Sequence, residues 1–328
     1  MQALRPTDPR WIGRFRLVGR LGAGGMGQVY LGRTPEGRQA AVKVIRDEFA
    51  ADPVFRRRFR REVSAALSVA GLFTARVLDA DPDGDPPWLA TEYVDGPSLR
   101  DAVQRGGPMG PAQLVELARG LAEALGAIHA AGLVHRDLKP ANVLLSPAGP
   151  KVIDFGIAWS AGGTQLTAAG QAIGTPEYMA PEQIGGTGQG GPPIDVFALG
   201  TVLVFAATGH SPFAAAQTAA VLYRIMQLEP DLAGVPAHLV GLVRACLAKD
   251  PAARPTAQQI AVALRGGPPV GVGPTVPGPP AAVAPPPPHH APQPGRRRGT
   301  AALATVAAVA VAATVTAVTL TLLQRPPA

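Results

Sequence analysis

The pattern of apolar and polar positions divides residues 11–265 into a short strand-rich part and a longer helical part. In the first part, apolar residues alternate or form short runs around a glycine-rich turn and after a second turn at residues 35–37, as is typical of strands. The strands expected there cover residues 14–21, 28–32 and 39–45. Residues 53–69 instead carry Phe55, Phe59, Val63 and Ala66 at helical spacing, which predicts one helix.

After about residue 97 the apolar spacing becomes mostly helical. The helices expected there cover residues 111–131, 194–208, 214–228, 237–247 and 256–264. We therefore predict an α+β domain with a small β-rich lobe at about residues 11–94 and a larger, mostly helical lobe at about residues 95–265.

Two segments of different composition follow this predicted domain. Residues 266–298 are dominated by Pro and Gly and end in three arginines, which is typical of a disordered, extended linker. Residues 299–323 contain no charge, and about 20 such residues can cross a bilayer as a helix. Because Ala and Thr make this segment only mildly hydrophobic, a buried or disordered tail is the alternative. The arginines favour a single span of the cell membrane with the domain in the cytoplasm, leaving residues 324–328 as a short extracytoplasmic tail.

Charge and cysteine content exclude some classes of function. The formal net charge is +7, and much of the excess lies in arginine runs at residues 56–61 and 296–298. Because the chain shows no helix-turn-helix pattern, zinc-ligand spacing or RNA-binding aromatic signature, we expect no nucleic-acid partner. The single cysteine, Cys246, cannot form an intrachain disulfide, and its apolar surroundings indicate a core residue rather than a nucleophile.

Residues 22–27 form the pattern Gly-x-Gly-x-x-Gly, which is weak evidence by itself. Here it lies between two predicted strands, so a dinucleotide-binding strand–helix crossover does not fit. In a strand–turn–strand the glycines let backbone amides approach phosphate groups closely. Lys43 follows in an apolar strand, where a buried-facing amine needs an anion. Glu62 on the predicted helix is a candidate partner, although spacing alone favours a surface residue.

The strongest motif is His-Arg-Asp-Leu-Lys-Pro-Ala-Asn at residues 135–142, in a predicted loop. Asp137 can accept a proton from a hydroxyl, and Lys139 can balance the charge of a phosphoryl group. Asn142 offers a neutral oxygen and Asp154, in Asp-Phe-Gly at residues 154–156, an anionic one, which suits Mg²⁺. Phosphoryl transfer needs these parts: positioned phosphates, a metal ion and an oriented hydroxyl.

The order of these motifs, with Ala-Pro-Glu at residues 180–182, resembles the eukaryotic-like (Hanks-type) serine/threonine protein kinases, most closely the membrane-anchored kinases of actinobacteria. The resemblance covers residues 11–265 and implies the bilobal kinase fold, with the helix at 53–69 as its regulatory helix. It implies ATP with Mg²⁺, or Mn²⁺ in its place, and protein substrates with Ser or Thr acceptors. It leaves open a homodimer, which the residues themselves do not establish.

The resemblance also assigns roles to individual residues. The catalytic set is Asp137, Lys139, Lys43 and Glu62, with Glu62 paired to Lys43, and the metal ligands are Asn142 and Asp154. The ATP-binding set is Gly22, Ala23, Gly24, Gly27, Val29, Ala41, Lys43, Thr91, Glu92 and Val94. Glu182 would pair with Arg254 and brace the large lobe, and Asp195 would support the catalytic loop from the helix at residues 194–208.

The segment between Asp154 and Glu182 would be the activation loop, with Thr167 and then Thr164 as the best-placed phosphorylation sites. A phosphate there can pair with Arg136 and order the loop. A scaffold that keeps the fold without the reaction is the competing interpretation. It is disfavoured because Lys43, Asp137, Asn142 and Asp154 are all present.

Overall fold

The computed structural model describes residues 1–155, 176–185 and 190–266. The chain divides into two compact units, Met1–Thr275 and Val276–Ala328, and all of the described residues belong to the first. The predicted phosphorylation sites Thr164 and Thr167, the linker from residue 267 onward and the predicted membrane span at residues 299–323 lie outside the described residues.

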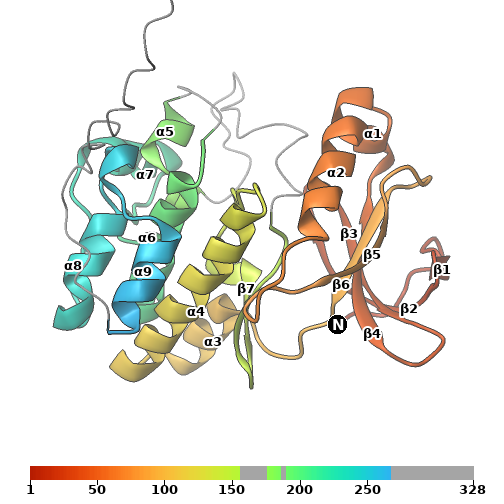
Figure 1. Cartoon of the computed structure of the whole chain (residues 1–328), viewed down its shortest axis with the longest axis horizontal. Coiled ribbons are helices and arrows are strands. Elements are labelled where there is room, and N and C mark those ends of the chain that lie inside the picture. The colour runs from red at the N-terminus through yellow and green to blue at the C-terminus, as the bar shows by residue number, and fades with distance from the viewer. Residues whose placement is uncertain (156–175, 186–189, 267–328) are drawn as a thin grey trace, which may run out of the picture. The chain divides into compact units, whose positions relative to one another are not determined.

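An antiparallel six-stranded sheet with the order β1-β2-β3-β4-β6-β5 forms the first lobe (Figure 1). Its strands are β1 (Trp11–Ile12), β2 (Phe15–Gly24), β3 (Gly27–Arg33), β4 (Gln39–Ile45), β5 (Val77–Asp81) and β6 (Trp88–Glu92). Two helices, α1 (Asp47–Ala50) and α2 (Pro53–Ala66), follow β4. The strand predicted at residues 39–45 is confirmed at both ends, and the helix predicted from residue 53 ends three residues earlier than expected.

Both faces of this sheet are covered by apolar side chains. On one face, Ile45 and Leu89 pack in the same core as Phe55 and Phe59 of α2. On the other face, a second core contains Phe15, Leu17, Tyr30, Ala40, Val42, Trp88 and Ala90. Neighbouring residues of a strand point to opposite faces of the sheet. Lys43 therefore lies on the α2 side, whereas its neighbours Val42 and Val44 lie on the outer side.

The residues before β1 belong to the folded lobe as well. Gln2 and Arg20 exchange two backbone hydrogen bonds of 2.9 and 2.8 Å. The Asp8 carboxylate is buried and accepts hydrogen bonds from Arg20 Nε at 2.7 Å and from the Tyr30 hydroxyl at 2.9 Å. The N-terminal segment is thereby attached to β2 and β3, a long-range contact that the sequence pattern does not indicate.

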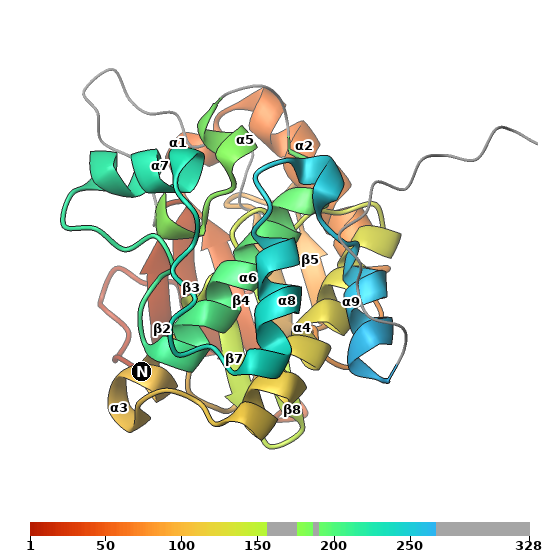
Figure 2. The same ribbon diagram turned by 90° about the vertical axis from the view of Figure 1, so that its left-hand side faces the viewer.

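The second lobe is mostly helical and contains one two-stranded sheet (Figure 2). Its helices are α3 (Leu99–Gly106), α4 (Pro111–Ala130), α5 (Pro181–Ile184), α6 (Pro193–Thr208), α7 (Thr218–Gln227), α8 (Ala237–Cys246) and α9 (Ala257–Leu264). The strands are β7 (Val143–Ser146) and β8 (Gly149–Val152), and single 3₁₀ turns cover Pro140–Asn142, Pro176–Tyr178 and Pro251–Ala253. The predicted two-lobed architecture is confirmed.

Helix α6 is the centre of this lobe. Apart from Asp195 and Thr201 it is apolar on all sides, and every residue from Ile194 to Ala207 is buried. A helix of that kind must be covered on all sides, and α4 and α8 contact it. Across the part of the chain that the structure describes, no helix combines the length and apolarity needed to cross a membrane.

Candidate active site

The glycine-rich turn joins β2 to β3, and its glycines differ in what surrounds them. A Cβ atom at Gly27 would lie 2.2 Å from the Val44 carbonyl oxygen, so packing alone requires glycine there. Cβ atoms at Gly22 and Gly24 would meet nothing within 4 Å, and neither residue has a positive φ. Neither packing nor backbone conformation therefore explains these two glycines. The open space suits a ligand that approaches the backbone closely, such as a polyphosphate.

The strand register brings four of the predicted ATP-binding residues to one face of the sheet. Val29 pairs with Lys43 across β3 and β4, and Ala41 pairs with Thr91 across β4 and β6. Paired residues point to the same face, and so do residues two apart on a strand. Glu92 follows Thr91 and donates its backbone N–H to the Arg76 carbonyl at 2.8 Å.

Lys43 contacts a carboxylate, as an amine facing this side of the sheet requires. Its side chain is 13 % exposed, and Nζ lies 3.3 Å from Asp154 Oδ1. Asp154 follows β8 and has φ = 58°, a left-handed conformation that is uncommon for residues other than glycine. The structure thus places the strand lysine directly beside the predicted metal ligand.

Glu62 has a different partner from the one expected. Its Oε1 lies 3.6 Å from Arg136 Nη1, and both side chains are largely buried. An ion pair between Lys43 and Glu62 is not among those formed by the described residues. Each of the four charges still faces an opposite one, because Asp154 neutralises Lys43 and Arg136 neutralises Glu62. A catalytic role for Glu62 therefore stays a prediction.

The catalytic loop brings Asp137, Lys139 and Asn142 together as predicted. Lys139 Nζ donates to both Asp137 oxygens, at 2.9 and 2.8 Å. Asn142 Nδ2 donates to the Asp137 backbone carbonyl at 2.8 Å and to its Oδ2 at 3.1 Å. With its amide nitrogen engaged in this way, Asn142 keeps its amide oxygen for a metal ion. The Asp137 side chain remains accessible to a substrate, since it is 44 % exposed.

A buried carboxylate on α6 holds the backbone of this loop. Asp195 is 1 % exposed and accepts hydrogen bonds from the N–H groups of His135 and Arg136, both at 2.8 Å. It also lies 2.8 Å from His129 Nε2, which must carry a proton because a carboxylate only accepts. Arg136 itself has φ = 65°. The predicted support of the catalytic loop by Asp195 is confirmed.

The two predicted metal ligands lie on adjoining segments. The Ile153 N–H donates to the Asn142 carbonyl at 3.0 Å, which ties the strand before Asp154 to the end of the catalytic loop. One carboxylate and one amide oxygen are a small ligand set. They fit Mg²⁺, which binds few protein groups and takes its remaining ligands from phosphates and water.

The second predicted brace is also present. Arg254 donates to both oxygens of Glu182, at 2.6 and 2.8 Å. Its guanidinium lies 5.0 Å from the ring centroid of Phe197, and its side chain is fully buried. The ion pair ties α5, at the end of the predicted activation loop, to the segment before α9.

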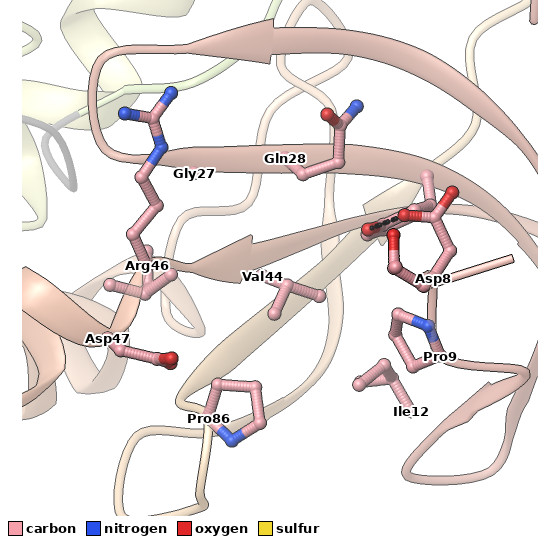
Figure 3. Close-up of a pocket in the computed structure, with 12 residues that line it drawn as sticks. Asp8, Pro9, Ile12, Gly27, Gln28, Val44, Arg46, Asp47 and Pro86 are labelled. Atoms are coloured by element: carbon pink, nitrogen blue, oxygen red, sulfur yellow. Dashed lines mark hydrogen bonds between the residues drawn. The ribbon is translucent and has the colours of Figure 1, made fainter. Parts of the chain in front are cut away.

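A separate cavity of about 410 Å³ lies on the outer face of the sheet (Figure 3). Its lining includes Asp8, Gln28, Val44 and Arg46, and Gly27 is the one predicted site residue among its walls. Gln28 and Arg46 were not recognised from the sequence as site residues, although Gln28 follows the glycine-rich motif and Arg46 follows the strand that carries Lys43.

Comparison with known proteins identifies the family. A family model described as "Protein kinase domain" matches residues 15–263. The chain belongs to this protein kinase domain family. The resemblance predicted from the motifs is therefore confirmed at the level of the family.

Two bacterial kinases illustrate the similarity of this domain to known proteins. The chain is 53 % identical over 264 residues to a probable serine/threonine-protein kinase, PkwA, of Thermomonospora curvata, covering 80 % of this chain and 35 % of that protein. It is 53 % identical over 253 residues to the serine/threonine-protein kinase AfsK of Streptomyces coelicolor, covering 77 % of this chain and 32 % of AfsK. The chain thus spans about a third of these relatives.

A solved structure shares the fold. The kinase domain of PknI from Mycobacterium tuberculosis is 28 % identical and superposes with a TM-score of 0.62, covering 81 % of this chain and 99 % of that domain.

Proposed function

We propose that the chain is a serine/threonine protein kinase that transfers the γ-phosphoryl group of ATP to protein hydroxyls. The observation that carries this proposal is the cluster of Asp137, Lys139 and Asn142, joined by hydrogen bonds of 2.8–3.1 Å. The Lys43–Asp154 pair supplies the second half of the site. Lys139 supports Ser/Thr rather than Tyr specificity, because tyrosine kinases usually differ at this position. The names of the relatives point the same way.

In this mechanism, ATP lies under the glycine-rich turn with its phosphates toward Lys43. The backbone amides near Gly22 and Gly24 contact the phosphates, and the Lys43 ammonium offsets part of their charge. Val29, Ala41 and Thr91 form the wall beside the adenine, and the backbone of Glu92 and Val94 binds its edge. Asn142 and Asp154 would hold Mg²⁺, which would neutralise charge on the phosphates.

The acceptor hydroxyl lies beside Asp137. Its oxygen forms a bond to the γ-phosphorus as the bond to the ADP oxygen breaks, and Asp137 accepts the hydroxyl proton. Lys139 contacts both Asp137 oxygens and would shift toward the transferred phosphoryl group. Because Asp195 holds the N–H groups of two neighbouring loop residues, the Asp137 carboxylate is positioned before substrate arrives.

We expect activation through phosphorylation of Thr167 or Thr164. A phosphate would attract Arg136, the residue that contacts Glu62 in this structure. Autophosphorylation between two copies of the chain is one route to that state, so a homodimer is part of the proposal.

The test is phosphate incorporation by the purified full chain. With labelled ATP and Mg²⁺, we expect phosphoserine or phosphothreonine on the chain itself or on an added protein. Asp137→Asn should abolish it while leaving ATP binding intact. Asp79→Asn is a matched control, because Asp79 forms an exposed pair with Arg14 and is not one of the proposed site residues. Incorporation that survives Asp137→Asn would contradict the proposal, and ATP binding without any incorporation would favour a scaffold.

Membrane attachment is a further part of the proposal. Residues 299–323 would cross the cell membrane once, with the kinase domain in the cytoplasm, because the segment is uncharged and follows three arginines. In cells, the full chain should resist alkaline extraction from the membrane fraction, and a variant lacking residues 299–323 should be released. Equal behaviour of the two chains would contradict the proposed span.

A further inference from the structure

Two polar side chains reach carbonyl groups of the glycine-rich turn. Arg46, the residue after β4, donates from Nη2 to the Gly24 carbonyl at 3.1 Å. Gln28, near the start of β3, donates from Nε2 to the Gly22 carbonyl. The backbone N–H of Arg46 also donates to the Met26 carbonyl at 2.9 Å. Three carbonyl groups of the turn, those of Gly22, Gly24 and Met26, thus accept hydrogen bonds from residues outside the glycine motif.

Both side chains approach from the face of the sheet that is opposite to Lys43. Gln28 precedes Val29, which shares a face with Lys43, and alternation places Gln28 on the other face. Gln28 and Arg46 both line the outer cavity beside Val44 (Figure 3). In Figure 3 their side chains extend from β3 and from the end of β4 toward β2.

The planarity of the peptide bond turns these contacts into an orientation of the amides. In a trans peptide the carbonyl and the N–H of the next residue point in opposite directions. When Gln28 holds the Gly22 carbonyl, the Ala23 N–H is directed away from the Gln28 side chain. When Arg46 holds the Gly24 carbonyl, the Gly25 N–H is directed away from the Arg46 side chain, and both donors approach from the face opposite to Lys43.

This orientation needs an external cause, because glycine does not impose one. Gly22, Gly24 and Gly25 have open space where a side chain would be, so packing does not select one conformation. A glycine-rich segment also loses more conformational freedom on ordering than other sequences. Hydrogen bonds from a charged donor are stronger than neutral ones, so Arg46 is well suited to reduce this freedom before the ligand binds.

We propose that Arg46 and Gln28 are positioning residues that aim the Ala23 and Gly25 amides at the phosphates of ATP. They touch neither the adenine nor the reacting atoms. This inference rests on the proposed kinase function. It predicts that both residues affect affinity for phosphate-bearing nucleotides and leave affinity for adenosine unchanged.

The test compares ATP, ADP and adenosine on the full chain, with calorimetry for affinity and initial rates for KM and kcat. We expect Arg46→Ala to raise the KM for ATP and the Kd for ADP about tenfold, the effect of one charge-assisted hydrogen bond that is partly exposed. The Kd for adenosine should stay within about twofold. Arg46→Lys should recover part of the loss, because its ammonium can donate one bond. Gln28→Ala should act in the same direction.

Glu48→Gln is the matched control. Glu48 lies 3.5 Å from Arg46 Nη1 and is exposed, so this variant changes the charge around Arg46 without removing its bond to Gly24. Its nucleotide affinities should equal those of the wild type. Thermal unfolding of every variant separates folding defects from binding effects. If Arg46→Ala does not fold, the nucleotide affinities of Gln28→Ala test the inference independently.

Three outcomes would overturn the inference: equal losses for adenosine and ADP, an unchanged KM for ATP in both alanine variants, or a loss in Glu48→Gln as large as in Arg46→Ala. Failure of the proposed function is distinguishable. In that case the wild-type chain itself would bind no ATP or transfer no phosphate, before any variant is compared.

Discussion

Replacing Asp195 with asparagine tests how the catalytic loop is held in place. The carboxylate accepts hydrogen bonds from the N–H groups of His135 and Arg136 and from His129 Nε2, all at 2.8 Å. An asparagine has nearly the same shape, but one of its two terminal atoms is an NH₂ donor. Whichever way the amide turns, that donor faces a backbone N–H of the loop.

The expected cost follows from these contacts. At least one charge-assisted hydrogen bond is lost, worth about 1.5–3 kcal/mol, and a buried N–H is left without an acceptor, at about 1–3 kcal/mol. The hydrogen bonds that remain are also weaker, because their acceptor is no longer charged. We therefore expect the free energy of unfolding to fall by about 3–6 kcal/mol, which is a large part of the net stability of a typical domain, about 5–15 kcal/mol.

Activity should fall further than nucleotide binding. Relief of the clash requires the loop backbone to move, and Asp137 lies one residue beyond Arg136. Because misplacement by about 1 Å can cost about 100-fold in rate, we expect kcat to fall by at least that factor. The KM for ATP should change little, since Lys43 and the glycine-rich turn contact neither Asp195 nor the loop backbone.

The assay is chemical denaturation together with steady-state kinetics on the same preparations. Asp79→Asn is the control for removing a carboxylate, since its exposed pair with Arg14 is worth less than about 1 kcal/mol. If Asp195→Asn kept wild-type stability and kcat, the three contacts would not hold the loop, and the account of its positioning would be wrong.

Two further predictions concern stability. Asp8→Asn should lower the free energy of unfolding by about 3 kcal/mol, because it leaves the largely buried Arg20 guanidinium without its carboxylate. The hydrogen bonds from Arg20 hold the pKa of Asp8 well below its usual 3.8, so this stabilisation is present above pH 3.8 and is lost at lower pH. An acid titration in which the wild type and Asp8→Asn lose stability in parallel would refute this role of Asp8. Burial raises the pKa of the Cys246 thiol from 9.0 to about 12, so the wild type should lose stability between pH 9 and 12 as the unfolded thiol ionises. Cys246→Ala should lose less over that range, and identical slopes in alkaline denaturation curves would contradict this assignment.

Much of the fold could be predicted because its elements have strong local patterns. The helices at residues 111–131 and 237–247 were placed within one residue of their observed ends, since their apolar spacing is regular. The helix expected from residue 214 begins at Thr218 instead, because Ser211 engages the N–H groups of Phe213 and Ala214 in a turn. Helix α3 was missed, although Ser98 caps it through the Asp101 N–H.

The site could be predicted where its residues are close in sequence. Asp137, Lys139 and Asn142 share one loop, and the motif already implies their contact. The partners of Glu62 could not be predicted, because the choice between Lys43 and Arg136 depends on how α2 sits against the catalytic loop. The contacts of Asp8 with Arg20 and of Arg46 with Gly24 are missed for a similar reason. No local sequence pattern indicates a hydrogen bond between segments that are distant along the chain.

The central claim is that this chain itself transfers phosphate to serine or threonine. The most direct measurement is the intact mass of the purified full chain after incubation with Mg²⁺ and ATP alone, followed by mapping of the modified residues. We predict mass increases in steps of one phosphate, located on Ser or Thr with Thr167 or Thr164 among them, and none in Asp137→Asn. An unchanged mass in the wild type although ATP binds, or phosphate on tyrosine only, would contradict the account.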